Sequence, residues 1–218
     1  MSKKKILKII GIILLVVLVI LLIHTIRNYI IITDLQDKIA KYSDSTNYYT
    51  KSVATESDNT TVIMEYYKKD NREVVFLERN LNGEISKLSI YNNGERTDTF
   101  WNNKDGKIAK LDSGTFLGVS IYNFTETDNN LQTFLGCIAA NIKSKKCNGK
   151  KCYVIKGFFS SDSLTSKGAE IYIDKDTGLY LKTIEGERTT SREYEFENVD
   201  ENIFIEPDIS EYTLKVNE

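Results

Sequence analysis

A long apolar segment near the N-terminus constrains this chain more than any other feature. From Ile9 to Ile23 every residue is apolar or glycine, and the stretch extends over residues 6–26 with Lys8 as its one charged member. A helix of that length, at about 1.5 Å per residue, crosses a hydrocarbon core of about 30 Å. We therefore expect residues 6–26 to form a transmembrane helix.

Flanking charges predict how this helix is oriented. Lys3, Lys4 and Lys5 precede it, whereas Arg27 alone follows closely. The positive-inside bias then makes residues 1–5 a cytoplasmic tail and puts the rest of the chain outside the cell membrane. A cleaved signal peptide is the alternative, but residues 24–28 offer no pair of small residues for cleavage. A buried core helix is disfavoured by the flanking lysines. The sequence thus indicates an uncleaved, single-pass signal anchor.

The balance of charge outside the membrane excludes one class of partner. Five of the 29 basic residues precede Asp34, the first acidic residue, which leaves 24 basic against 31 acidic residues, or about −7. Nucleic-acid-binding proteins need a basic face that neutralises phosphates. We therefore expect no nucleic acid partner.

A juxtamembrane helix is expected over residues 28–46, as a separate element or as a continuation of the anchor. Its apolar residues recur at spacings of three and four, the period of an amphipathic helix: Ile32, Leu35, Ile39 and Tyr42. Residues 47–218 contain no repeat, low-complexity tract or linker that would divide them. They are predicted to form one extracytoplasmic β-rich domain.

Short strands separated by turn residues dominate this domain. The expected strands cover residues 48–55, 61–68, 73–79, 86–91, 97–101, 107–111, 152–158, 169–174, 179–184 and 192–199. Their even spacing and hairpin turns predict an antiparallel meander.

One further helix is expected between residues 111 and 152. An apolar stripe at helical spacing marks it, with Thr127 or Asp128 as the cap: Leu131, Phe134, Leu135, Ile138 and Ile142. We expect this helix to pack on one face of the sheet.

Residues suited to catalysis are scarce. The sole histidine, His24, lies at the outer end of the expected membrane helix, so a Ser or Cys nucleophile outside would lack its usual base. Glu193, Glu195 and Glu197 alternate with aromatic residues, which is typical of a strand with one solvated face. Residues 174–178 look like half a calcium loop but lack the later Glu ligand, and they favour a tight hairpin. We expect no enzyme, no metal site and no cofactor.

The three cysteines are candidates for a disulfide. Cys147 and Cys152 flank residues 148–151, and two cysteines across such a hairpin loop come within disulfide range. An oxidising outer compartment favours a Cys147–Cys152 bridge, and a bridge from Cys137 to one of them is the alternative. An unpaired Cys137 would be an inert buried thiol on its helix. A three-cysteine metal site would lack a recognisable fourth ligand.

Two stretches resemble known envelope proteins. Residues 88–94 read LSIYNNG and lead to TFW at 99–101, and residues 152–156 read CYVIK and lead to IYIDKDTGL at 171–179. With the order of elements, they resemble the lipoprotein-carrier superfamily of the bacterial cell envelope (LolA/LolB type) over residues 33–205. The segment IYIDKDTG is also similar to strands of PepSY-type domains. The carrier resemblance implies a curved antiparallel β-sheet (half-barrel) packed with one or two helices. With the N-terminal transmembrane helix in front of this sheet, the expected fold class is α+β. That helix is a departure from the family, whose carriers are soluble or lipidated. The resemblance also implies a cavity for acyl chains or a hydrophobic peptide.

Two functions follow as hypotheses. The first is a non-catalytic, membrane-anchored extracytoplasmic protein that binds a lipid, lipoprotein or other hydrophobic envelope component. The second is an envelope structural or regulatory protein that binds another protein without a small ligand. A hydrolase is the least favoured, because the outer domain has no histidine.

Overall fold

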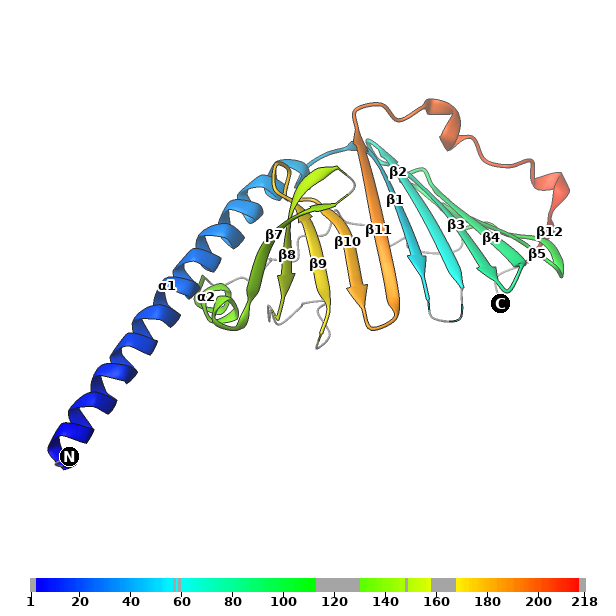
Figure 1. Cartoon of the computed structure of the whole chain (residues 1–218). Coiled ribbons are helices and arrows are strands. Elements are labelled where there is room, and N and C mark those ends of the chain that lie inside the picture. The colour runs from blue at the N-terminus through cyan, green and yellow to red at the C-terminus, as the bar shows by residue number, and fades with distance from the viewer. Residues whose placement is uncertain are drawn as a thin grey trace. The chain divides into compact units, whose positions relative to one another are not determined.

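The computed structural model of the chain describes residues 3–56, 58, 60–112, 130–147, 149–157 and 168–215. The chain forms two compact units. The anchor unit comprises Met1–Ala40 and Asn123–Leu179, and the sheet unit comprises Lys41–Tyr122 and Tyr180–Glu218. A long N-terminal helix followed by antiparallel strands (Figure 1) confirms the predicted fold class.

Helix α1 dominates the anchor unit. It is one continuous helix of 41 residues, Lys3–Ser43, so the predicted anchor and juxtamembrane helix form a single element. Among the described residues it is the one helix long and apolar enough to cross a membrane, and its apolar window is not buried in the protein. Further along α1, three residues of the predicted apolar stripe are buried: Ile32, Leu35 and Ile39.

The rest of the anchor unit is a short helix and a three-stranded sheet. Helix α2 (Asn130–Ala139) leads into β7 (Asn141–Cys147), β8 (Lys150–Lys156) and β9 (Glu170–Asp174). These strands pair antiparallel in chain order. Their buried residues are mainly β-branched, such as Val154, Ile155, Ile171 and Ile173, which suits a pleated core surface.

The turn that follows β9 fixes the outer half of α1. Lys38 Nζ donates to the Lys175 carbonyl oxygen over 2.6 Å. Gly178 has a φ of +76°, and a Cβ atom at this position would come within 2.6 Å of the Leu35 carbonyl oxygen. Both the backbone conformation and the close approach to α1 therefore require glycine here. The positive φ agrees with the predicted tight hairpin over residues 174–178.

The sheet unit contains nine strands among its described residues. They are β1 (Asn47–Thr55), β2 (Thr61–Lys69), β3 (Arg72–Leu81), β4 (Glu84–Asn92), β5 (Thr97–Asn103), β6 (Gly106–Lys110), β10 (Tyr180–Glu185), β11 (Arg188–Phe196) and β12 (Thr213–Leu214). Their order is β12-β6-β5-β4-β3-β2-β1-β11-β10, antiparallel except for the β12–β6 pair. In Figure 1 the strands from β11 to β5 turn progressively, which is the normal twist of a long sheet.

The ends of the ten predicted strands lie within four residues of the observed ones, and β12 falls in the tail after residue 206, for which the sequence predicts a loop and a short extended end. Strand β7 was missed. Ile142, assigned to the helical stripe, lies in β7, because α2 ends at Ala139. The suggested caps Thr127 and Asp128 lie outside the described residues. Exposed lysines along β7 hid the strand, since they leave few apolar residues for an alternating pattern.

One face of the sheet unit is covered by the C-terminal segment. Its core is Val74, Tyr91, Phe100 and Ala109. Side chains of the 3₁₀ helices η1 (Glu201–Phe204) and η2 (Ile209–Glu211), and of the residue after η2, pack against this core: Ile203, Phe204 and Tyr212. Edge-to-face rings link Tyr91 to Phe100 and Phe100 to Tyr212, with centroids 5.7 and 5.1 Å apart. The C-terminal segment therefore covers the part of this face around these residues.

Candidate functional site

A row of apolar side chains crosses the opposite face of the sheet unit. Its members are directly paired between neighbouring strands, Met64 with Leu77, Leu77 with Leu88, Leu88 with Trp101 and Trp101 with Ile108. We call these five residues the apolar row. Side chains of directly opposed residues lie on one face with their Cβ atoms about 5 Å apart, so the row is continuous from β2 to β6.

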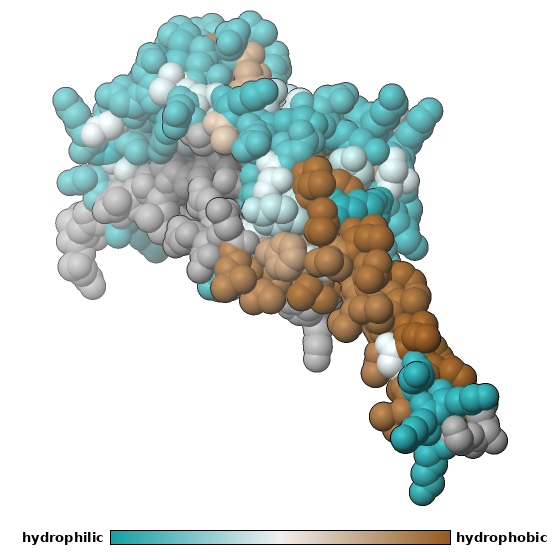
Figure 2. Space-filling model, turned by 90° about the vertical axis from the view of Figure 1, so that its left-hand side faces the viewer, coloured by the Kyte–Doolittle hydropathy of each residue, from teal (hydrophilic) through white to brown (hydrophobic). Residues whose placement is uncertain are grey.

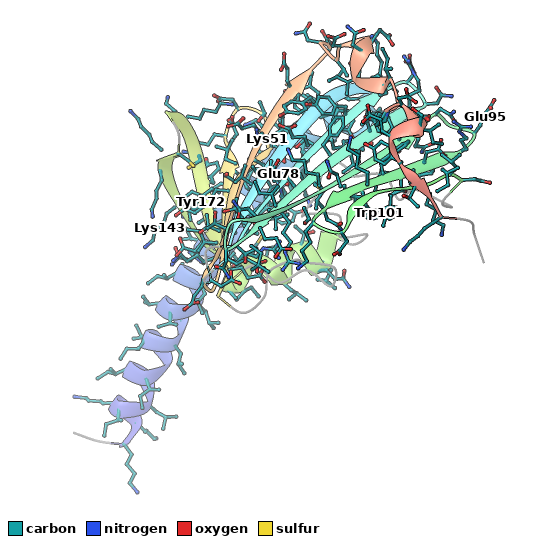
Figure 3. The ribbon with its side chains drawn as sticks, turned by 90° about the vertical axis from the view of Figure 1, so that its right-hand side faces the viewer. Lys51, Glu78, Glu95, Trp101, Lys143 and Tyr172 are labelled. Atoms are coloured by element: carbon teal, nitrogen blue, oxygen red, sulfur yellow. The ribbon has the colours of Figure 1, made fainter. Side chains whose placement is uncertain are left out.

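The apolar row is half-buried along its whole length. The covered face differs, because Val74 and Phe100 are 1% and 3% exposed there. Trp101, the sole tryptophan of the chain, lies on β5 near one end of the row (Figure 3). The row therefore offers large apolar side chains that still have surface available for contact.

Toward β1 the same face becomes fully buried and aromatic. Tyr48, Tyr66 and Val75 form a cluster, against which Met64, Ile90 and Phe196 pack. The Tyr66 hydroxyl donates to Glu73 Oε1 over 2.8 Å, and burial raises the pKa of Tyr66 far above its ordinary value. This hydroxyl therefore stays protonated and serves as a structural hydrogen-bond donor, so the cluster provides a rigid apolar end to the row.

The described residues contain no group of three or more His, Cys, Asp or Glu side chains that could hold a metal ion. Glu193, Glu195 and Glu197 are exposed, which confirms the predicted solvated face of that strand. What the arrangement offers chemically is apolar contact.

Comparison with solved structures finds proteins of weak overall similarity. A lipoprotein-sorting protein domain described as putative, from Vibrio parahaemolyticus, matches with 11% identity and a TM-score of 0.33, over 78% of this chain and 94% of its own. A LolA superfamily protein from Nitrosomonas europaea matches with 10% identity and a TM-score of 0.24, over 80% and 97%. At this identity the likeness concerns the fold alone.

A conserved protein of uncharacterised function from Thermus thermophilus also matches, with 10% identity and a TM-score of 0.46, over 84% of this chain and 98% of its own. No protein-family model and no curated protein matches the chain. A structure named for this superfamily thus occurs among the neighbours, in line with the resemblance stated from the sequence.

In the anchor unit, α1 holds the C-terminal end of α2 through a polar pair. Asn28 Nδ2 donates to the carbonyl oxygens of Ala140 and Cys137 over 2.7 and 3.1 Å. His24 Nε2 lies 3.0 Å from the same Ala140 oxygen. His24 Nε2 also lies 3.0 Å from Asn28 Nδ2, so both side chains and the Ala140 carbonyl form one polar cluster. The last carbonyls of a helix lack partners within that helix, and α1 supplies them here.

Sequence reasoning missed the role of this pair. It placed His24 at the membrane boundary but gave neither His24 nor Asn28 a partner. A usable signal was present, since His24 and Asn28 are polar residues four positions apart, on one face of a helix whose residues 9–23 are all apolar or glycine.

The cysteines lie in the anchor unit as free thiols, and Cys137 and Cys152 are buried. The β7–β8 hairpin is tighter than the sequence suggested, because Lys150 and Lys151 belong to β8. Cys147 pairs with Lys150 and Cys152 with Lys145, so the two cysteines are diagonal neighbours on one face. Diagonal neighbours lie near the upper limit of disulfide reach, and the Cys147–Cys152 bridge stays a prediction.

Proposed function

We propose that this chain is a non-catalytic binding protein, anchored by α1 in a bacterial cell membrane, whose apolar row receives a hydrophobic envelope component. An acyl chain of a lipid or lipoprotein is the ligand class that fits the row best. The row is the observation that carries this proposal: five large apolar side chains in direct register over five strands, all half-buried.

Anchoring in a membrane is supported by the surface of α1. Every large apolar residue from Ile9 to Ile23 is exposed to the surroundings of the protein, with Leu15 and Leu18 each 62% exposed. Exposed apolar area of this extent is unfavourable in water but favourable in lipid. Lysines before the segment support a cytoplasmic N-terminus, single-pass topology and an extracytoplasmic sheet unit.

Binding at the apolar row can be tested through Trp101, because its emission comes from the row alone. The full chain in lipid nanodiscs is titrated with a brominated fatty acid, whose bromine atoms quench tryptophan on contact. We expect saturable quenching. Leu88→Gln should weaken binding by about five- to a hundredfold, because its amide would be buried beside the acyl chain at a cost of about 1–3 kcal/mol.

Lys87→Gln provides the matched control, since Lys87 is exposed on the same strand and points to the opposite face. This variant should bind as the wild type does. Quenching that never saturates, or that is equal in Leu88→Gln and the wild type, contradicts the proposal. It would favour the alternative in which the sheet binds another envelope protein without a small ligand.

A further inference from the structure

Helix α2 presents an apolar surface to the surroundings of the protein. Leu131, Leu135 and Ile138 are 61%, 53% and 46% exposed. At 100° per residue these three side chains cluster on one side of the helix. The opposite side carries Thr133 and Cys137, which are buried. The helix is therefore amphipathic in an inverted sense, with its small and polar residues inside and its large apolar residues outside.

This surface lies at the level of α1 where the proposed membrane span ends. Asn28 and His24 bind the end of α2, and the rings of Tyr29 and Phe134 contact edge-to-face with centroids 5.8 Å apart. The apolar stretch that begins at Ile6 extends over about 30 Å by residue 26. Helix α2 is thus fixed beside the outer boundary of the bilayer.

Apolar surface of α1 extends to the level of α2. Ile26 and Ile30 of α1, at this same level, are 43% and 60% exposed. Figure 2 shows one apolar surface that runs along the α1 span and onto the neighbouring part of the same unit. The medium that surrounds α1 at this level therefore also contacts the exposed side of α2.

We propose that α2 is an interfacial helix that inserts Leu131, Leu135 and Ile138 into the outer leaflet of the membrane that α1 spans. This inference rests on the proposed anchoring. Lipid is the partner, because the lipid around α1 would also cover the adjoining apolar side of α2. An amphipathic helix at this level buries its apolar face at the boundary between head groups and acyl chains. With α2 attached on one side, α1 also has a fixed rotation about its axis.

Tryptophan scanning in brominated lipid tests this arrangement. Three variants of the full chain are made in a Trp101→Phe background: Leu15→Trp in the α1 span, Leu135→Trp on α2 and Lys146→Trp on β7. Lys146 is exposed and lies five residues beyond the start of β7, about 17 Å along the strand. Each variant is reconstituted in nanodiscs of phosphatidylcholine brominated either near the head group or near the chain ends.

Leu135→Trp should be quenched severalfold more than Lys146→Trp, and more by the shallow bromine than by the deep one. Leu15→Trp should show the reverse depth preference. An unquenched Leu15→Trp would overturn the anchoring itself. A deeply quenched Leu15→Trp with equal quenching at Leu135→Trp and Lys146→Trp would overturn the α2 inference alone, and crosslinked dimers through α2 would then identify a second copy as its cover.

Discussion

Two apolar helical stripes of the anchor unit have the same periodicity but differ in burial. Ile32, Leu35 and Ile39 of α1 are 0%, 0% and 3% exposed, whereas Leu131, Leu135 and Ile138 of α2 are 61%, 53% and 46% exposed. Spacings of three and four residues identify an apolar face in both cases. The difference shows that periodicity locates the face of a helix but not the medium that covers it.

Neighbouring residues decide the outcome for each stripe. In α1 the turn after β9 comes within contact distance of the helix, because Gly178 lets its backbone approach Leu35 and Ile39. In α2 the side that faces the protein is small, with Thr133, Gly136 and Cys137 buried there. Small residues on one side let α2 approach its neighbours closely, so its large residues are left facing outward.

The largest expected effect comes from truncating one leucine side chain in each stripe. Leu35→Ala should lower the free energy of unfolding of the full chain in detergent micelles by about 2–5 kcal/mol, because a fully buried leucine leaves a cavity. Leu135→Ala, its matched control, should change this free energy by less than about 0.5 kcal/mol, as exposed substitutions do. Urea denaturation followed by circular dichroism measures both. Equal losses in the two variants would show that protein, and not lipid or detergent, covers the α2 stripe.

Much of the fold could be predicted from sequence because its signals are local. The α1 span is continuous in the chain, and turns such as Asn82-Gly83 and Asp174 to Gly178 mark their hairpins by residue type alone. Strand β7 was missed because its lysines remove the alternation that identifies a strand, and because Ile142 happened to extend the α2 spacing.

The candidate site could be predicted only in part. Leu88 and Trp101 were singled out within the segments that carry the family resemblance, yet nothing in the chain says that they are cross-strand partners. That relation depends on register, and a slip of one residue would move Leu88 to the other face. The exposure of the α2 stripe could not be predicted either, because the periodicity of Leu131, Leu135 and Ile138 does not say what covers them.

Reactivity of Cys137 provides a second, smaller test of how α2 is turned. This thiol is fully buried on the side opposite the exposed stripe, and burial raises its pKa to about 11. A pKa two units above that of an ordinary thiol leaves about a hundredfold less thiolate at pH 8. The rate of alkylation by iodoacetamide should therefore be at least that much lower than for the same residue in concentrated urea, and should rise with pH through 9 and 10.

Peptide mass spectrometry reads this rate, and the same digest reports whether Cys147 and Cys152 are linked. Cys147, which is only half-buried, serves as the internal control for reagent access if it is unlinked. Rapid alkylation of Cys137 at pH 8 would mean that α2 is rotated, which would place its large apolar residues inside and make its stripe equivalent to that of α1.

The smallest expected effect comes from the polar pair that holds α2 in place. Asn28→Ala removes two hydrogen bonds to α2 carbonyls and should cost about 1–3 kcal/mol locally, seen as roughly five- to a hundredfold faster hydrogen exchange of the α2 amides. Thr33→Ala is the control, because the Thr33 hydroxyl donates only within α1, to Tyr29 and Ile30. If exchange in α2 is the same in both variants, the buried side of α2 alone sets its orientation. If only Asn28→Ala accelerates exchange, α1 determines both stripes, burying its own and turning that of α2 outward.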